Sequence, residues 1–141
     1  MSQGVRLLGA VAVFVFRRGR LLAMRRSKAK DAAPGAWEVL SGRIEPGEQP
    51  ACAAAREARE ESGLDVRIAQ RPIDAYVARR RRGAMIVVAY RGRAPRGEVV
   101  RSGEHDASAW MTLREFARAC PFPRLVEAAR RAARSPRPRR R

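Results

Sequence analysis

A dense apolar run from Leu7 to Phe16 constrains the fold of this chain more than any other feature. It is rich in Val and Phe, which favour strands, and a polar Arg-Gly stretch separates it from a second apolar run, Leu21 to Met24. This order predicts a β-hairpin whose first strand is buried on both faces. The run is shorter than the roughly 18 apolar residues of a membrane span, and no small-residue cleavage site follows it. We therefore expect a cytoplasmic protein with no membrane span.

The rest of the chain alternates between strand and helix patterns. Further strands are predicted at Trp37–Leu40, Val66–Ile68, Ile73–Ala78 and Met85–Tyr90, the last two joined by a hairpin loop over residues 79–83. Helices are predicted at Pro50–Ser62, Leu113–Ala119 and Leu125–Ala133. Interleaved elements of this kind predict a mixed α/β domain with helices on both sides of a sheet.

The central helix has the clearest boundaries. Pro50 suits the first helical position, and Gly63 lies where a left-handed residue ends a helix. The helix is rich in alanine, and the face carrying Ala51, Ala55 and Ala58 is apolar but small. We expect that face to approach the sheet closely.

Length and charge set the domain organisation. The 141 residues predict one domain over residues 1–133, followed by a disordered basic tail over 134–141 that contains only Arg, Ser and Pro. The formal net charge is +17. Such a charge favours polyanions, but it also fits an Arg-rich solvated surface, and composition does not decide between the two. Cys52 and Cys120 cannot form a disulfide framework, which fits a reducing compartment.

Three carboxylates gather on one face of the central helix. Glu57, Glu60 and Glu61 are spaced by three and four residues, so they lie close together and repel one another near a helix end that disfavours anions. A hard divalent cation such as Mg²⁺ or Mn²⁺ would reverse that repulsion. The alternative is a solvated lattice of salt bridges with Arg56 and Arg59.

The spacing around this helix is more specific than the helix alone. Eight positions fit the pattern G-x5-E-x7-R-E-U-x-E-E-x-G-U, where U is apolar: Gly42, Glu48, Arg56, Glu57, Glu60, Glu61, Gly63 and Leu64. Residues 42–64 therefore resemble a complete Nudix box. The chain departs from the family at Ala58, where a larger aliphatic residue is typical, and at Leu40-Ser41, where the family usually has Pro-Gly. The resemblance implies a Nudix-type α/β/α sandwich with a mixed sheet between helices.

The same resemblance implies metal-ligand and positioning roles. It makes Glu57 and Glu61 ligands of Mg²⁺ or Mn²⁺, with Glu60 as a third ligand or an orienting residue and the backbone carbonyl of Gly42 as a further ligand. Arg56 is expected to act in catalysis with Glu57 and Glu60 by holding a glutamate through a bidentate pair.

Residues outside the helix complete the expected site. Glu48 is expected to be the partner of Arg56 or an outer ligand, at the substrate-binding end of the box. Arg26 is expected to contact substrate phosphate, with an exposed strand-end arginine as the alternative. Glu104, six residues before Trp110, is a candidate general base, and the alternative is a surface glutamate. The adjoining His105 is expected to be exposed in a loop.

The resemblance implies an enzyme, a Nudix pyrophosphohydrolase. Its metal-activated water would cleave the diphosphate link of a nucleoside diphosphate derivative or nucleoside triphosphate. The alternative is a nucleic-acid-binding or RNA 5′-end-processing protein on the same scaffold, based on the net charge and the basic tail. A silent sensor domain is disfavoured because the carboxylate set is intact. Relatives dimerise, but no apolar patch argues for a homodimer here, so that partner stays open.

Overall fold

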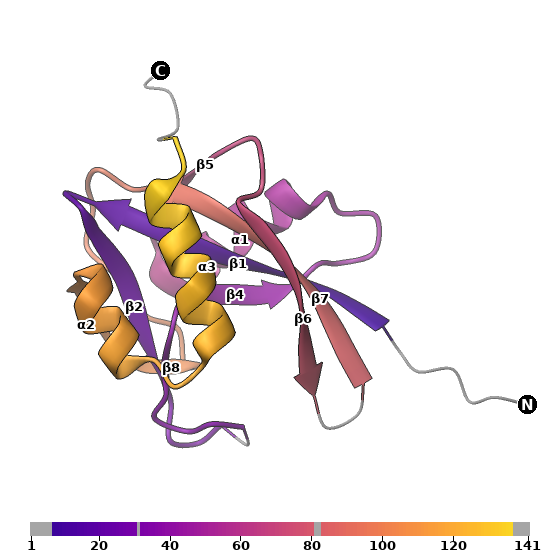
Figure 1. Ribbon diagram of the computed structural model, residues 1–141, viewed down its shortest axis with the longest axis horizontal. Coiled ribbons are helices and arrows are strands. Elements are labelled where there is room, and N and C mark those ends of the chain that lie inside the picture. The colour runs from indigo at the N-terminus through magenta and orange to yellow at the C-terminus, as the bar shows by residue number, and fades with distance from the viewer. Residues whose placement is uncertain (1–6, 31, 81–82, 137–141) are drawn as a thin grey trace, which may run out of the picture.

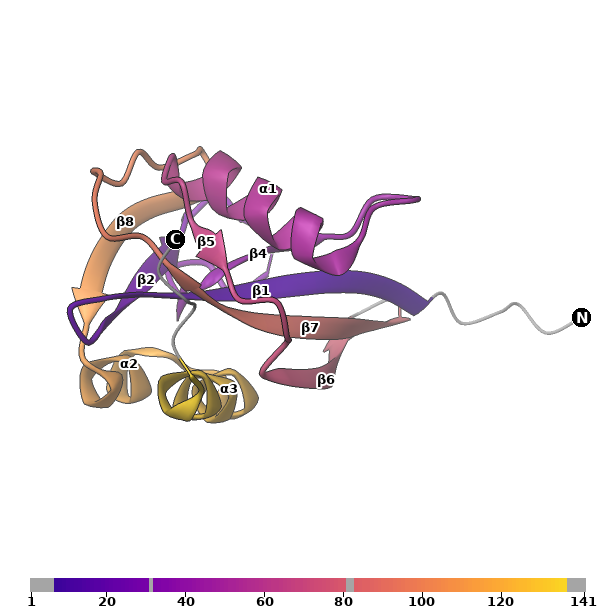
Figure 2. The ribbon, with the colours of Figure 1, turned by 90° about the horizontal axis from the view of Figure 1, so that it is seen from above.

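The computed structural model describes residues 7–30, 32–80 and 83–136. Its strands form one mixed sheet: β1 (Leu7–Arg17), β2 (Arg20–Arg26), β3 (Trp37–Glu38), β4 (Leu40–Arg43), β5 (Arg67–Ile68), β6 (Asp74–Arg80), β7 (Gly83–Arg93) and β8 (His105–Met111). Helix α1 (Pro50–Ser62) covers one face of the sheet, and α2 (Leu113–Ala119) and α3 (Pro123–Arg134) cover the other (Figures 1 and 2). The predicted α/β/α sandwich is confirmed.

Strand β1 lies at the centre of the sheet. It pairs in parallel with β7 and antiparallel with β2 and β4, so the sheet is mixed as expected. Its side chains alternate between the two faces, because successive residues of a strand point in opposite directions. Val11, Val13 and Val15 pack under α1, whereas Phe14 and Phe16 pack under α2 and α3. The prediction that this strand is buried on both faces is confirmed.

Helix α1 has the predicted limits but a different buried face. Pro50 lies in its first turn, and Gly63 ends it with φ 70°, its N–H donating to the carbonyl of Arg59. The residues turned to the sheet are Ala53, Ala54, Ala58, Glu61 and Ser62. Ala55, expected on the packed face, is exposed. The buried face of the helix is therefore rotated from the predicted face of Ala51, Ala55 and Ala58, and it includes the acidic residue Glu61.

Several boundaries differ from the sequence predictions. The predicted strand at residues 37–40 divides into β3 and β4, and β4 continues through Gly42, beyond the predicted end at Leu40. The extension is possible because β4 pairs with β1. Helix α3 reaches Arg134, the first residue of the predicted tail. Residues 81–82 of the predicted hairpin loop and 137–141 of the tail lie outside the described residues.

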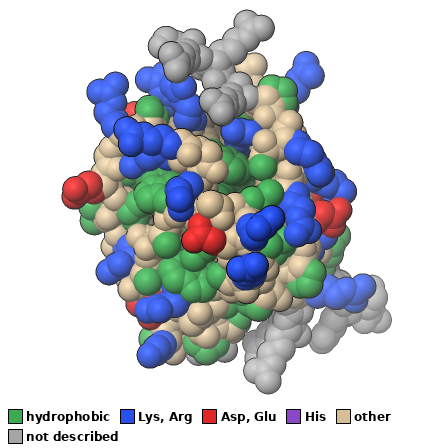
Figure 3. Space-filling model, turned by 60° about the vertical axis from the view of Figure 1, so that its left-hand side comes forward, with side chains coloured by type: hydrophobic (Ala, Val, Ile, Leu, Met, Phe, Trp, Pro, Cys, Tyr) green, Lys and Arg blue, Asp and Glu red, His purple; other side chains and the backbone are tan. Residues whose placement is uncertain are grey.

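The described surface matches the composition. The face seen in Figure 3 carries many Lys and Arg side chains and few acidic ones. None of the helices in the described part of the chain has the length and apolar character needed to cross a lipid bilayer.

Candidate active site

The candidate site begins where strand β4 contacts helix α1. Gly42 lies opposite Val11 in the β4–β1 pairing. A Cβ atom at position 42 would collide with the carboxyl group of Glu57. Glycine at this position therefore lets the Glu57 carboxylate lie directly against the strand, and the backbone of β4 becomes one wall of the acidic site.

Arg56 organises the box. Its Nε and Nη2 atoms donate to Oε2 and Oε1 of Glu48, both at 2.8 Å. Its Nη1 atom donates to Glu57 at 2.9 Å and to Glu60 at 3.3 Å. The bidentate pair, with its hydrogen bonds, lowers the pKa of Glu48 to about 2. Arg56 thus has the expected geometry for a positioning residue, and Glu48 is its bidentate partner.

Glu61 is the buried carboxyl group of the site. The residue is only 4% exposed, and its Oε1 accepts a hydrogen bond from the backbone N–H of Ser41 at 2.9 Å. Burial raises the pKa of Glu61 to about 9, with further increases from Glu104 and Glu57. Burial of an unneutralised carboxylate is costly, so this side chain needs either a proton or a cation.

The neighbouring glutamates differ in their surroundings. Burial raises the pKa of Glu57 against the opposing effect of Arg56, and the charges of Glu60 and Glu104 raise it further. Glu60 lies at the outer side, where its side chain is 58% exposed. Within the described residues, no three Asp, Glu, His or Cys side chains form a ready-made cation site.

The donor set nevertheless fits a hard cation. Glu57 and Glu61 offer carboxylate oxygens on one side of α1, and Gly42 leaves the space in which the Glu57 carboxylate lies. Oxygen-only donors suit Mg²⁺ or Mn²⁺ rather than a softer metal.

Glu104 comes from a distant part of the chain. Its backbone carbonyl accepts the N–H of Ser27 at 2.9 Å, which fixes the loop before β8. Its side chain is 55% exposed and lies 3.9 Å from the Lys30 ammonium group. It also faces Glu61 closely enough to raise that residue's pKa. The fold therefore brings Glu104 to the carboxylates of α1.

Arg26 lies in a cluster that sequence reasoning missed. Its Nη1 atom donates to both carboxylate oxygens of Glu38, at 3.2 and 3.3 Å, and its Nε donates to the carbonyl of Ala32. His105, expected to be exposed in a loop, begins β8, is buried and has its Nε2 atom 2.8 Å from Glu38. That expectation is wrong because β8 pairs with β2 and carries His105 inward opposite Arg26.

No spacing along the sequence could have revealed this cluster, since its members come from β2, β3 and β8. The only signal was the strand pairing itself, which places residues 26, 38 and 105 at one end of the sheet. The predicted contact between Arg26 and substrate phosphate stays a prediction.

The family comparison agrees with the motif. The sequence matches the NUDIX domain over residues 6–134. A CTP pyrophosphohydrolase of Escherichia coli is 30% identical over 114 residues, which cover 79% of this chain and 80% of that protein. An octanoyltransferase of Myxococcus xanthus is 36% identical over 117 residues, but the match spans 80% of this chain and only 32% of that protein.

Solved structures show the same architecture. A MutT protein from Methanosarcina mazei superposes with a TM-score of 0.83 at 21% identity, covering 94% of this chain and 97% of that one. The solution structure of the Escherichia coli ORF135 protein gives a TM-score of 0.73 at 28% identity, covering 92% and 94%. Motif, fold and sequence matches agree: the chain belongs to the Nudix family.

Proposed function

We propose that this chain is a divalent-metal-dependent pyrophosphohydrolase that cleaves the diphosphate link of a nucleoside diphosphate derivative or nucleoside triphosphate. One observation carries the proposal. Glu61 is buried beside Glu57 and Glu104, and its carboxyl group is influenced by the backbone N–H of Ser41 and by those two carboxyl groups. A site that gathers buried negative charge in this way is matched to a cation.

Glu57 and Glu61 would hold the cation, with Glu60 and the carbonyl of Gly42 as further ligands. A divalent cation supplies neutralisation of phosphate charge and acidifies water at this site. Glu61 would carry a proton when no cation is bound, because burial raises the pKa of that carboxyl group to about 9. Binding would therefore release a proton, and affinity for the metal would rise with pH.

Other residues of the chain would position the ligands, accept a proton and contact the substrate. Arg56 holds Glu57 and Glu60 in place and is itself held by Glu48. Glu104 would accept the proton of the attacking water, because its carboxylate is half exposed and faces the helix. Arg26 would contact substrate phosphate only by releasing part of its pairing with Glu38.

The relatives favour a nucleotide as substrate. A CTP pyrophosphohydrolase is among the relatives, and a dihydroneopterin triphosphate pyrophosphohydrolase is among the similar solved structures. Both substrates carry a polyphosphate chain. We therefore place CTP among the first substrates to test. Cytoplasmic location, a homodimer and nucleic-acid binding through the basic tail stay predictions, as does the division into residues 1–133 and 134–141.

The test is the release of phosphorylated products from a panel of nucleotides with and without Mg²⁺, separated and measured by ion-exchange chromatography. The panel contains CTP, the four deoxynucleoside triphosphates, ADP-ribose and diadenosine tetraphosphate. We expect Mg²⁺-dependent release from at least one compound, loss of that release in Glu57→Gln and Glu61→Gln, and full activity in the surface control Glu127→Gln on α3. Release that continues unchanged in Glu61→Gln would contradict the proposal, and so would activity that needs no divalent cation.

A further inference from the structure

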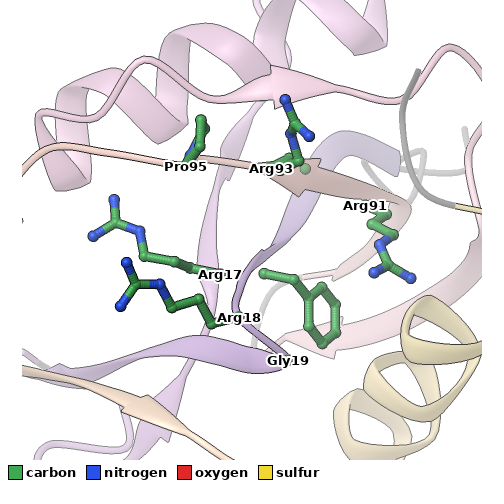
Figure 4. A pocket seen from close by; sticks show the side chains of 8 residues that line it. Arg17, Arg18, Gly19, Arg91, Arg93 and Pro95 are labelled. Carbon is green, nitrogen blue, oxygen red and sulfur yellow. The ribbon is translucent and has the colours of Figure 1, made fainter. Parts of the chain in front are cut away.

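A cavity lies at the carboxyl ends of the parallel strands β1 and β7, and no residue of α1 lines it. Its volume is about 340 Å³, and it is lined by Phe16, Arg17, Arg18, Gly19, Arg91, Gly92, Arg93 and Pro95. Figure 4 shows Arg17 and Arg18 on one side, Arg91 on the other and Arg93 above them in that view. Four arginines and no acidic residue line this pocket.

The partners of these arginines set them apart from the other partly buried arginines of the chain. Arg56 and Arg26 meet carboxylates, as does Arg124, whose guanidinium donates to Asp74. In the pocket, Arg17 instead donates to the backbone carbonyls of Ala94 and Gly97, at 2.6 and 3.0 Å. Carbonyl oxygens satisfy hydrogen bonds but leave the positive charge uncompensated.

The same contacts hold the pocket rigid. The Arg17 guanidinium lies over the ring of Trp110, 4.5 Å from its centre, in addition to its two carbonyl contacts. Arg91 lies over the ring of Phe16 and donates to the carbonyls of Ala132 and Ser135 at the end of α3. Side chains fixed in this way lose little freedom when they bind a ligand.

Donor atoms are left over after these contacts. Among the described residues, the Nη2 atom of Arg17 and the Nε atom of Arg93 are buried without a hydrogen-bond partner. None of the ion pairs formed within the described chain involves Arg17, Arg18 or Arg93. Buried guanidinium N–H groups without partners are costly, and an oxyanion is the ligand that matches their geometry and charge.

We propose that this pocket binds the phosphate group of a small organic phosphate, at a site separate from the carboxylates of α1. The cavity lies within the roughly 300–1,000 Å³ range of small-molecule sites, so it has space for more than a bare anion. Phe16 and Pro95 give part of its wall an apolar character suited to the organic portion. Guanidinium groups are the donors that proteins use most effectively for phosphate.

Trp110 makes the binding measurable at the site itself. The chain has two tryptophans, so Trp37→Phe leaves Trp110 as the only one, directly beneath Arg17. Its fluorescence is recorded while inorganic phosphate, and separately cytidine monophosphate, is added in EDTA at constant ionic strength. We expect saturable changes, with the nucleotide binding at least as tightly as inorganic phosphate.

Pocket variants are compared in the same background. Arg93→Gln and Arg18→Gln should each weaken phosphate binding about tenfold or more, the loss expected for a charge-assisted hydrogen bond. Arg96→Gln is the matched control, since Arg96 is exposed, close in sequence and absent from the lining. Circular dichroism and melting temperature check folding, and Arg18, at the exposed turn, tests the idea even if Arg93→Gln does not fold.

Four outcomes would overturn the proposal. These are no saturable response to either probe, equal binding by the parent and both pocket variants, an equal loss in Arg96→Gln, and a response to single-stranded RNA alone. The third outcome would indicate a diffuse field and the fourth a nucleic-acid surface. Binding of inorganic phosphate without the nucleotide would show that the organic portion of the proposed ligand is wrong.

Discussion

Replacing Glu61 with Gln should make the metal-free protein more stable at neutral pH. The native carboxyl group is buried beside Glu57 and Glu104, and its pKa is raised from 4.5 to about 9. The folded protein therefore binds this proton more tightly than the unfolded chain does. Its stabilising contribution is complete below pH 4.5 and is lost progressively as the pH rises toward 9.

The magnitude follows from the same two values. pH 7 lies about 2.5 units above the pKa of this group in the unfolded chain, and each unit costs the folded, protonated state about 1.4 kcal/mol. The loss is therefore about 3 kcal/mol, or roughly 10 °C in melting temperature for a domain of this size. Glutamine still accepts the Ser41 N–H but carries no charge, so Glu61→Gln should escape this loss.

The assay is denaturant unfolding in EDTA at pH 5, 6, 7 and 8, for the parent protein, Glu61→Gln and the surface control Glu127→Gln. The parent and the control should lose stability with rising pH, while Glu61→Gln should lose markedly less. Added Mg²⁺ should stabilise the parent at pH 8, because a ligand of the folded state shifts the equilibrium, and it should do little for Glu61→Gln. Parallel pH curves for the parent and Glu61→Gln would refute the reasoning.

Three further substitutions test other contacts. Arg56→Lys loses the bidentate contact, so we expect at least a tenfold fall in Mg²⁺-dependent hydrolysis with Arg59→Lys near normal; equal rates in steady-state assays would contradict this. Gly42→Ala forces the Glu57 carboxyl group to move, and calorimetric titration should show weaker Mg²⁺ binding in a folded protein, an expectation that unchanged affinity would remove. Asp74→Asn should lower the free energy of unfolding by about 1–2 kcal/mol at pH 7, because its two arginine partners hold the pKa of Asp74 low and stabilise the ionised form. Urea unfolding at pH 7 and 3 should show that the stability difference between the parent and the variant shrinks in acid, as Asp74 is protonated.

Local sequence patterns were sufficient for most of the secondary structure. Pro50 and Gly63 predicted both ends of α1, and the helix predicted at Leu113–Ala119 is present as α2, where a capping box joins Thr112 and Glu115. These signals are local, because a cap or a turn depends on residues that lie within a few positions of one another. The boundary of β4 was missed because Gly42 is held in the sheet by pairing with a distant strand.

The candidate site was also predicted only in part from the sequence. The spacing of Glu57, Glu60 and Glu61 placed them on one helix, but it could not show that Glu61 alone of the three is fully buried. Which face of α1 is buried depends on how the helix packs on the sheet, and this tertiary packing cannot be derived from the helix sequence alone. The cluster around Glu38 was missed for a related reason, since charged residues in separate strands give no signal until the strands are paired.

The alternation of β1 has a consequence for how the domain opens. One strand supplies Val11, Val13 and Val15 to the layer beneath α1 and Phe14 and Phe16 to the layer beneath α2 and α3. Neither layer can be dismantled without displacing the strand that the other requires. The backbone amides of β1 should therefore exchange with deuterium only through global opening, and the helices on opposite sides should unfold as one cooperative unit.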